Sequence, residues 1–387
     1  MTDLERILAL WRELDTEGAD YVLATVEAVE GPSYRKPGAL MLLAQDGRRV
    51  GTVSGGCLEA EVARRAWWLT GNGPTIQRYS TAEDDGDRPY GSGCGGVVWL
   101  LLERKATANP LLGALEQAFQ RRIPMAVATI LEGEQAGRRA FAGLEPGRTE
   151  NPSFKAAGTL QNLAELALAG RSSAIETISI RGIDVRVWTD FRSARHGLWL
   201  FGAGDDAQPL LRLGKEMGWY VAVADGRSNL ASRERFPRAD EIHVMPVEEL
   251  PVRRSVGRPA VLDNLRSHDA AVVMSHSFEQ DSHVLASLLA LATPPIYIGV
   301  LGPQRRTREL LVEAARLLDL EADAACSNSD AVERWLSKLN APTGLELGAD
   351  SPETVALSIV AEIQKAFAGA TALPLREVRS AAAVSPR

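Results

Sequence analysis

The sequence contains little cysteine and little histidine. Its 387 residues include three cysteines and five histidines, of which the first is His196. So few cysteines in so long a chain do not make a disulfide framework, and we expect a reducing cytoplasm as the location. No C-x-x-C occurs, and the chain before His196 has no Cys/His set that could form a zinc site.

Targeting and membrane signals are also missing. Residues 1–5 are acidic and lack the apolar core of a signal peptide. The longest charge-free run, residues 284–304, has the length of a membrane span, but Pro294 and Pro295 interrupt it. A helix, a turn and a buried strand explain this run better. No G-x-x-x-x-G-K-[ST] motif is present, which excludes a P-loop.

Composition and charge indicate a soluble globular protein. Hydrophobic residues make up 45% and charged residues 24% of the chain, and the net charge is −7. This acidic balance argues against non-specific binding to nucleic acid or to anionic membranes. The length predicts two or three domains.

The clearest motif is G-x-G-x-x-A, formed by Gly202, Gly204 and Ala207 after a short apolar run. An amphipathic helical pattern follows, and a second predicted strand ends at Asp225, 23 residues after Gly202. This is the order of a nucleotide-binding βαβ unit, in which the glycines approach phosphate and the carboxylate binds a ribose hydroxyl. Further strands at 241–245, 270–274 and 296–300 predict a doubly wound parallel sheet, and hence an α/β fold.

The carboxyl ends of these strands should meet at one crevice, which would bring together residues 225–227, 275–277 and 302–306. His276 in this group is either an acid/base, a hydrogen-bonding partner of a ligand, or an ordinary loop histidine. Asp205 and Asp206 oppose a pyrophosphate at the start of the helix. Either a cation bridges them or the domain binds a dinucleotide weakly or not at all.

The part of the chain before residue 196 reads as a mixture of helices and strands. We expect helices at 3–16, 58–69 and 110–122, a hairpin turn at Asp46-Gly47, a surface loop over 132–158 and paired strands on either side of Arg181-Gly182. The predicted domains are residues 1–105, a middle segment 106–195 packed with them, a Rossmann-like domain 196–345, and a helix with a disordered tail at 346–387.

Three glycine-containing loops precede residue 97. They are residues 31–38 with the cations Arg35 and Lys36, residues 54–57, and residues 91–96 at the end of an acidic stretch. Such loops resemble anion cradles, although ordinary surface turns have the same composition. We expect a ligand that carries phosphate, with contacts from Ser54, Gly55, Gly56, Gly93, Gly95 and Gly96.

Two of these loops contain cysteines, Cys57 and Cys94. Cys57 follows two glycines at a predicted helix start, where backbone N–H groups and the helix dipole favour a thiolate. Both thiols are candidate ligands for a metal in one pocket, and the alternative is two buried, inert cysteines. Cys326 has no such context.

Together these motifs resemble the xanthine dehydrogenase accessory proteins of the XdhC/CoxI type. The matching segments are residues 31–38, Ser54-Gly55-Gly56-Cys57-Leu58-Glu59, Gly93-Cys94-Gly95-Gly96, Phe201-Gly202-Ala203-Gly204, residues 297–302 and residues 344–349. The resemblance implies a cytoplasmic, non-catalytic chaperone that binds molybdenum cofactor, supports its sulfuration and inserts it into a xanthine dehydrogenase-like hydroxylase. Its implied partners are the apo-enzyme, a cysteine desulfurase and a second copy of the chain.

Two other functions stay open on the sequence. One is an NAD(P)-dependent oxidoreductase that uses Gly202, Gly204 and Asp225, with Arg227 accommodating a 2′-phosphate. The other is a structural adaptor without a small ligand.

Overall fold

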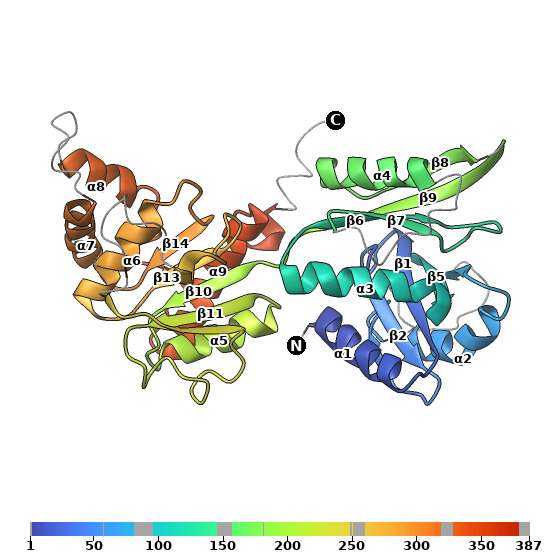
Figure 1. Cartoon of the computed structure of the whole chain (residues 1–387), viewed down its shortest axis with the longest axis horizontal. Helices are drawn as coiled ribbons and strands as arrows, with labels where there is room; N and C mark the ends of the chain where they lie inside the picture. Colours follow the sequence, from blue (N-terminus) through green and yellow to red (C-terminus); the bar gives the residue numbers. More distant parts are fainter. Residues whose placement is uncertain are drawn as a thin grey trace. The chain divides into compact units, whose positions relative to one another are not determined.

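The computed structural model divides the chain into two compact units, Met1–Arg195 and His196–Arg387 (Figure 1). The residues that it describes are 2–56, 58–80, 96–144, 157–180, 182–247, 250, 260–318 and 328–378.

A five-stranded antiparallel sheet forms the first half of the N-terminal unit. Its strands lie in the order β3-β2-β1-β5-β4. Alternate side chains of β1 face opposite sides: Val22 packs with α2, whereas Leu23 packs with α1 and α3. The elements are α1 (Asp3–Thr16), β1 (Tyr21–Glu30), β2 (Leu40–Ala44), β3 (Arg49–Gly51), α2 (Glu59–Leu69), β4 (Thr75–Ser80), β5 (Val97–Arg104) and α3 (Lys105–Arg121).

A second, four-stranded antiparallel sheet completes this unit, in the order β7-β6-β9-β8. Leu160 and Ala164 of α4 pack against its apolar face. The predicted pair of strands around residues 181–182 is confirmed, since Ile180 of β8 lies opposite Ile183 of β9. The elements are β6 (Met125–Ile130), β7 (Arg139–Ala142), α4 (Ala157–Gly170), β8 (Ala174–Ile180) and β9 (Ile183–Arg192).

Two expectations for the N-terminal unit were wrong. Helix α3 begins at Lys105, so that Pro110 lies inside the helix instead of at its start. Burial of Leu111 and Leu115 offsets the hydrogen bond that Pro110 cannot donate. Strand β7 lies within the stretch 132–158 that was expected to be loop, because antiparallel pairing with β6 orders its four residues.

The C-terminal unit has the predicted parallel sheet, with strands in the order β12-β11-β10-β13-β14. This is the order of a Rossmann-like fold, and the α/β prediction is confirmed. The strands are β10 (Gly197–Phe201), β11 (Tyr220–Asp225), β12 (Glu241–Val244), β13 (Ala270–Val273) and β14 (Tyr297–Val300).

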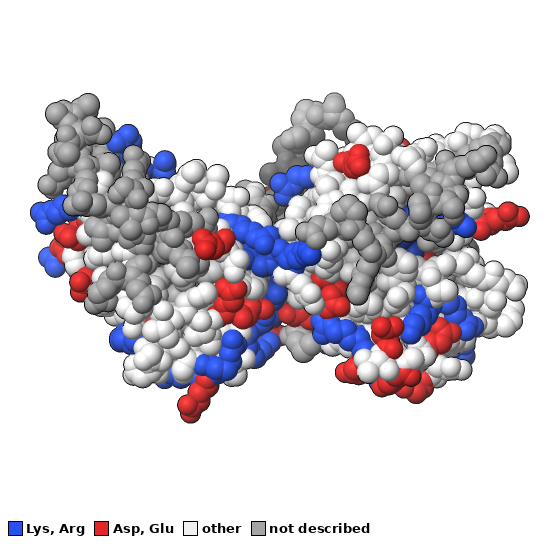
Figure 2. Space-filling model, in the orientation of Figure 1, with Lys and Arg blue, Asp and Glu red and all other residues white. Residues whose placement is uncertain are grey.

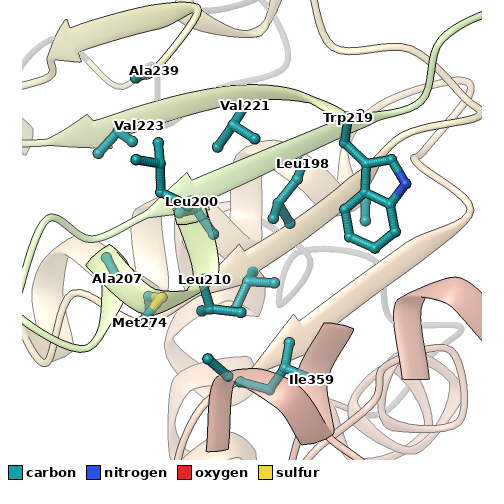
Figure 3. Close-up of a cluster of buried hydrophobic side chains, with 14 of the residues drawn as sticks. Leu198, Leu200, Ala207, Leu210, Trp219, Val221, Val223, Ala239, Met274 and Ile359 are labelled. Carbon is teal, nitrogen blue, oxygen red and sulfur yellow. The ribbon is translucent and has the colours of Figure 1, made fainter. Parts of the chain in front are cut away.

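Helices cover both faces of this sheet. On one face, Leu198 and Leu200 of β10 pack with Leu210 of α5 and Ile359 of α9 (Figure 3). Side chains of α6 and α7 pack on the other face, and α8 packs against α7. The bounds are α5 (Ala207–Glu216), α6 (Phe278–Leu289), α7 (Gln304–Leu317), α8 (Asn328–Leu336) and α9 (Pro352–Ala368).

The surface carries charges of both signs. On the face drawn in Figure 2, acidic and basic side chains are interspersed over both units. Among the residues described, no helix combines the length and apolar character that crossing a bilayer requires.

Candidate functional site

The glycine-containing loops of the N-terminal unit meet at one end of its first sheet. Glu30, the last residue of β1, lies opposite Val97, the first residue of β5. This pairing places Gly96 against the 31–38 loop, so closely that a Cβ atom on Gly96 would clash with the carbonyl oxygen of Pro32. Only glycine fits there.

The 54–56 loop reaches the same place. A Cβ atom on Gly55 would lie 2.9 Å from Cδ1 of Tyr34, and Gly55 has a φ of +113°. The structure therefore brings together three of the predicted segments, residues 31–38, 54–56 and Gly96. Cys57, Gly93, Cys94, Gly95 and Cys326 lie outside the described residues, as does most of the acidic stretch before Gly93.

The amide groups of the 54–56 loop already have an acceptor, the carboxylate of Glu59. Glu59 is the first residue of α2 and is only 4% exposed. Its two oxygens accept hydrogen bonds from the N–H groups of Val53 (3.0 Å), Ser54 (2.9 Å), Gly55 (3.2 Å) and Gly56 (2.9 Å) and from the Ser54 hydroxyl (2.8 Å). A carboxylate thus occupies the place where such a loop would bind an external anion.

These hydrogen bonds determine the charge of Glu59. Burial raises the pKa of its carboxyl group, but the backbone and hydroxyl of Ser54 and the amide of Gly55 more than offset this and hold the pKa at about 2. Sequence reasoning missed this role for Glu59. The available signal was a carboxylate in the first turn of a helix that follows two glycines.

The two cations of the 31–38 loop have different environments. Arg35 donates to Asp3 Oδ2 at 2.5 Å and to Thr52 Oγ1 at 2.7 Å, which ties the loop to α1 and to the end of β3. The backbone carbonyl of Lys36 accepts from the N–H of Ala39 at 3.1 Å, whereas its side chain is exposed and has no ion pair or hydrogen bond within the described part of the chain. Of the two, Lys36 is the one available to an incoming anion.

In the C-terminal unit the first glycine of G-x-G-x-x-A is required by the sheet itself. Gly202 has a φ of +138°, and a Cβ atom there would lie 2.5 Å from the backbone of Met274, just after β13. At Gly204, the nearest atom to such a Cβ is Oδ1 of Asp206, at 2.7 Å. The carboxylate of Asp206 therefore lies against the glycine turn.

Asp225 is fully buried and bound within the protein. Its oxygens accept from the N–H of Ala203 at 2.8 Å and from the backbone N–H, Nε and Nη2 of Arg227, each at 2.9 Å. Burial raises the pKa of Asp225, but the hydrogen bonds from Arg227 and Ala203 outweigh this, and the net pKa lies below its usual value. The arginine occupies the position in which a ribose hydroxyl would meet this carboxylate.

The two aspartates at the start of α5 each have a partner. His276 Nε2 lies 2.9 Å from Asp206 Oδ2, and Arg235 Nη2 lies 2.7 Å from Asp205 Oδ1. His276 has a φ of +61°, unusual for a residue other than glycine. The side chain of His276 is 65% exposed, so it is accessible to a ligand.

Hydrogen bonds link the segments after β11, β13 and β14, the last of them through Asp281 of α6. Arg227 Nη2 donates to the carbonyl oxygen of Ser275 at 3.1 Å. Asp281 in turn accepts from the Ser275 hydroxyl at 2.5 Å and from Arg306 Nη2 at 2.8 Å. Among the described residues, no cluster of three or more His, Cys, Asp or Glu side chains could hold a metal ion.

Two family models match the chain. The XdhC and CoxI family model covers residues 14–80, which include the 31–38 loop and Glu59. The XdhC Rossmann domain model covers residues 198–363, which include Gly202, Asp225 and His276. Together they span more than half of the chain. The chain belongs to the XdhC/CoxI family.

Similar proteins agree with this assignment. The chain is 29% identical over 348 residues to a probable xanthine dehydrogenase subunit from Bacillus subtilis, covering 88% of this chain and 92% of that protein. It is 35% identical over 132 residues to the molybdenum cofactor insertion chaperone PaoD of Escherichia coli, covering 32% and 38%. A crystal structure of a xanthine dehydrogenase from Bacillus halodurans matches with a TM-score of 0.67 and 28% identity over 96% and 97% of the two chains.

Proposed function

We propose that this chain binds molybdenum cofactor and inserts it into a xanthine dehydrogenase-like molybdenum hydroxylase. The observation that carries the proposal is the convergence of residues 31–38, 54–56 and Gly96 at one end of the first sheet. Two of these segments lie within the range matched by the XdhC and CoxI family model, and the relative PaoD is named a molybdenum cofactor insertion chaperone.

The chemistry of the cargo suggests a role for each residue. Molybdenum cofactor carries a phosphate group, for which Lys36 is the available cation. Because the amides of Ser54, Gly55 and Gly56 donate to Glu59, these residues shape the loop instead of binding the phosphate. Cys57 and Cys94 remain the proposed ligands for the soft, sulfur-bound metal end.

In this proposal the chain is a maturation factor that protects the cofactor and supports its sulfuration. A cysteine desulfurase would supply the sulfur, the apo-hydroxylase would receive the loaded cofactor, and the chain would act as a homo-oligomer. The C-terminal unit would hold any nucleotide through Gly204 and His276, since Gly202 and Asp225 are engaged within the protein.

Transfer of the cofactor tests this function directly. The protein is loaded anaerobically with sulfurated molybdenum cofactor, separated from free cofactor by gel filtration, and mixed with a cofactor-free xanthine dehydrogenase. We expect hydroxylase activity to appear faster and in higher yield than with the same amount of free cofactor. Equal activation by free cofactor, with none retained by the protein, would contradict the proposal.

A further inference from the structure

We infer that Tyr34 is the platform on which the pterin ring of the cargo stacks. The inference rests on the proposed function and names the residue that binds the pterin part of the cofactor. Tyr34 is 79% exposed, and although the guanidinium of Arg35 lies 5.9 Å from the ring centroid, much of the ring is available for contact with another molecule.

One edge of the exposed ring packs against the 54–56 loop. It lies against Gly55, whose missing side chain leaves space for it, since a Cβ atom there would be 2.9 Å from Cδ1 and 3.1 Å from Cγ of Tyr34. Gly55 in turn is held through its N–H group by the buried Glu59. An aromatic ring supported by an anchored loop loses little conformational freedom when a ligand stacks on it.

Space and charge beside the ring suit a planar anionic ligand. A Cβ atom on Gly56 would meet no other atom of the described residues within 4 Å, so these residues leave space next to Gly55. Lys36, two residues after Tyr34, is exposed and unpaired within the described residues, whereas Arg35 is turned toward Asp3 and Thr52. A pterin phosphate has both features, since its flat heterocycle can stack on Tyr34 and its phosphate can pair with Lys36.

Trp68 provides a matched comparison. Its side chain is 77% exposed, almost as much as that of Tyr34, and it belongs to the same unit. It lies near the end of α2, nine residues after Glu59 and therefore about 13 Å along the helix axis from the glycine loop. If the cofactor bound any exposed aromatic ring regardless of its position, replacing Trp68 would weaken binding as much as replacing Tyr34.

The experiment measures the dissociation constant of molybdenum cofactor, released anaerobically from a molybdenum hydroxylase, from quenching of its pterin fluorescence. We expect Tyr34→Ala to weaken binding on the order of tenfold, and Tyr34→Phe and Trp68→Ala to change it by less than about twofold. Thermal unfolding should be unchanged in Tyr34→Ala because the ring is exposed. Equal affinity of Tyr34→Ala and wild type overturns the inference and leaves the proposed function standing, whereas absence of binding by wild type overturns both.

A second probe separates stacking from charge. Free pterin without phosphate should bind more weakly to Tyr34→Ala than to wild type, and equally to Lys36→Gln and wild type. Sensitivity of this neutral probe to Lys36→Gln but not to Tyr34→Ala would overturn the assignment.

Discussion

The carboxylate of Glu59 accepts hydrogen bonds from both the backbone N–H and the hydroxyl of Ser54, at 2.9 and 2.8 Å. This pair closes the loop that precedes α2, and the Ser54 hydroxyl also accepts from the N–H of Leu58 at 3.0 Å. The protein thus supplies its own anion to the glycine loop. The loop is consequently formed before any cargo arrives, and the conformation of Gly55 and Gly56 does not depend on bound phosphate.

Replacing Glu59 with glutamine should destabilise the N-terminal unit. The pKa of this carboxyl group falls from 4.5 to about 2 on folding, which corresponds to about 3 kcal/mol of stability at neutral pH. A depressed pKa stabilises the folded state above pH 4.5, and this contribution is lost as the pH falls toward 2. Glu59→Gln should therefore lower the free energy of unfolding by about 3 kcal/mol at pH 7, with a smaller difference in acid.

Urea denaturation at several pH values measures this difference. Glu61→Gln, on the same helix, is the control, because Glu61 pairs with the exposed side chains of Arg64 and Arg65 and should contribute less than about 1 kcal/mol. Equal stability of Glu59→Gln and wild type at neutral pH would show that the buried carboxylate does not hold the loop.

Replacing Lys36 with glutamine should affect cofactor binding, whereas replacing Arg35 with glutamine should affect stability. Lys36→Gln should weaken cofactor binding about fivefold at low salt, with the loss shrinking as ionic strength rises, and should leave the melting temperature unchanged. Arg35→Gln should lower the melting temperature, because Asp3 and Thr52 lose their common partner. Cofactor titrations at two salt concentrations and thermal unfolding measure these effects. Weaker binding only in Arg35→Gln and a lower melting temperature only in Lys36→Gln would mean that Arg35 binds the phosphate and Lys36 holds the loop.

In the C-terminal unit, Asp225→Asn should destabilise the fold by about 3 kcal/mol, because it removes a buried carboxylate from Arg227 and Ala203. The pKa of Asp225 lies below its usual value in the folded state, so its stabilising effect is present at neutral pH and declines in acid. Asp205→Asn is the control at the same end of the sheet. Its carboxylate is 90% exposed, and the change should stay within about 0.5 kcal/mol.

The carboxylate of Glu27 on β1 should destabilise the protein at neutral pH, in contrast to those of Glu59 and Asp225. It is 1% exposed, one oxygen pairs with Arg186 at 2.6 Å, and the other has no partner among the described residues. Burial raises the pKa of Glu27 more than Arg186 lowers it, so the ionised side chain costs stability above its usual pKa.

Glu27→Gln should accordingly stabilise the protein by about 1 kcal/mol at pH 7, since the Arg186 side chain is 39% exposed and can be solvated by water. The gain should disappear below about pH 4, where Glu27 is protonated in both the folded and unfolded states. Chemical denaturation at both pH values measures it, and a loss of stability at neutral pH would mean that the ion pair outweighs the cost of burial.

The sequence was most informative where a signal is local. Strand β10, the turn at Gly202 and the end of β11 at Asp225 follow from a short apolar run and the spacing of small residues, and the structure has them where predicted. Arg35 and Lys36 show the limit. They are adjacent and carry the same charge, and only the tertiary positions of Asp3 and Thr52 give one of the two side chains partners among the described residues.

The partners of buried carboxylates were likewise beyond sequence reasoning. Asp225 was expected to bind a ribose, and nothing in its own segment shows that Arg227 folds back onto it. Strand β7 was missed because its four residues, although Gly137 and Gly143 flank them, are too few to stand out from a stretch rich in glycine and charge. For β7 the deciding contact is its pairing with β6, and for Asp225 it is the side chain of Arg227, whose conformation the sequence does not show.

The decisive property of the intact protein is its affinity for molybdenum cofactor. Wild type, Cys57→Ala and Cys94→Ala are each titrated anaerobically with the cofactor. We predict stoichiometric binding by wild type and a loss of affinity of about tenfold or more in at least one cysteine variant. Absence of binding by wild type, together with a rise in its melting temperature on addition of NAD or NADP, would exclude a cofactor chaperone and point to a nucleotide-dependent enzyme built on Gly202.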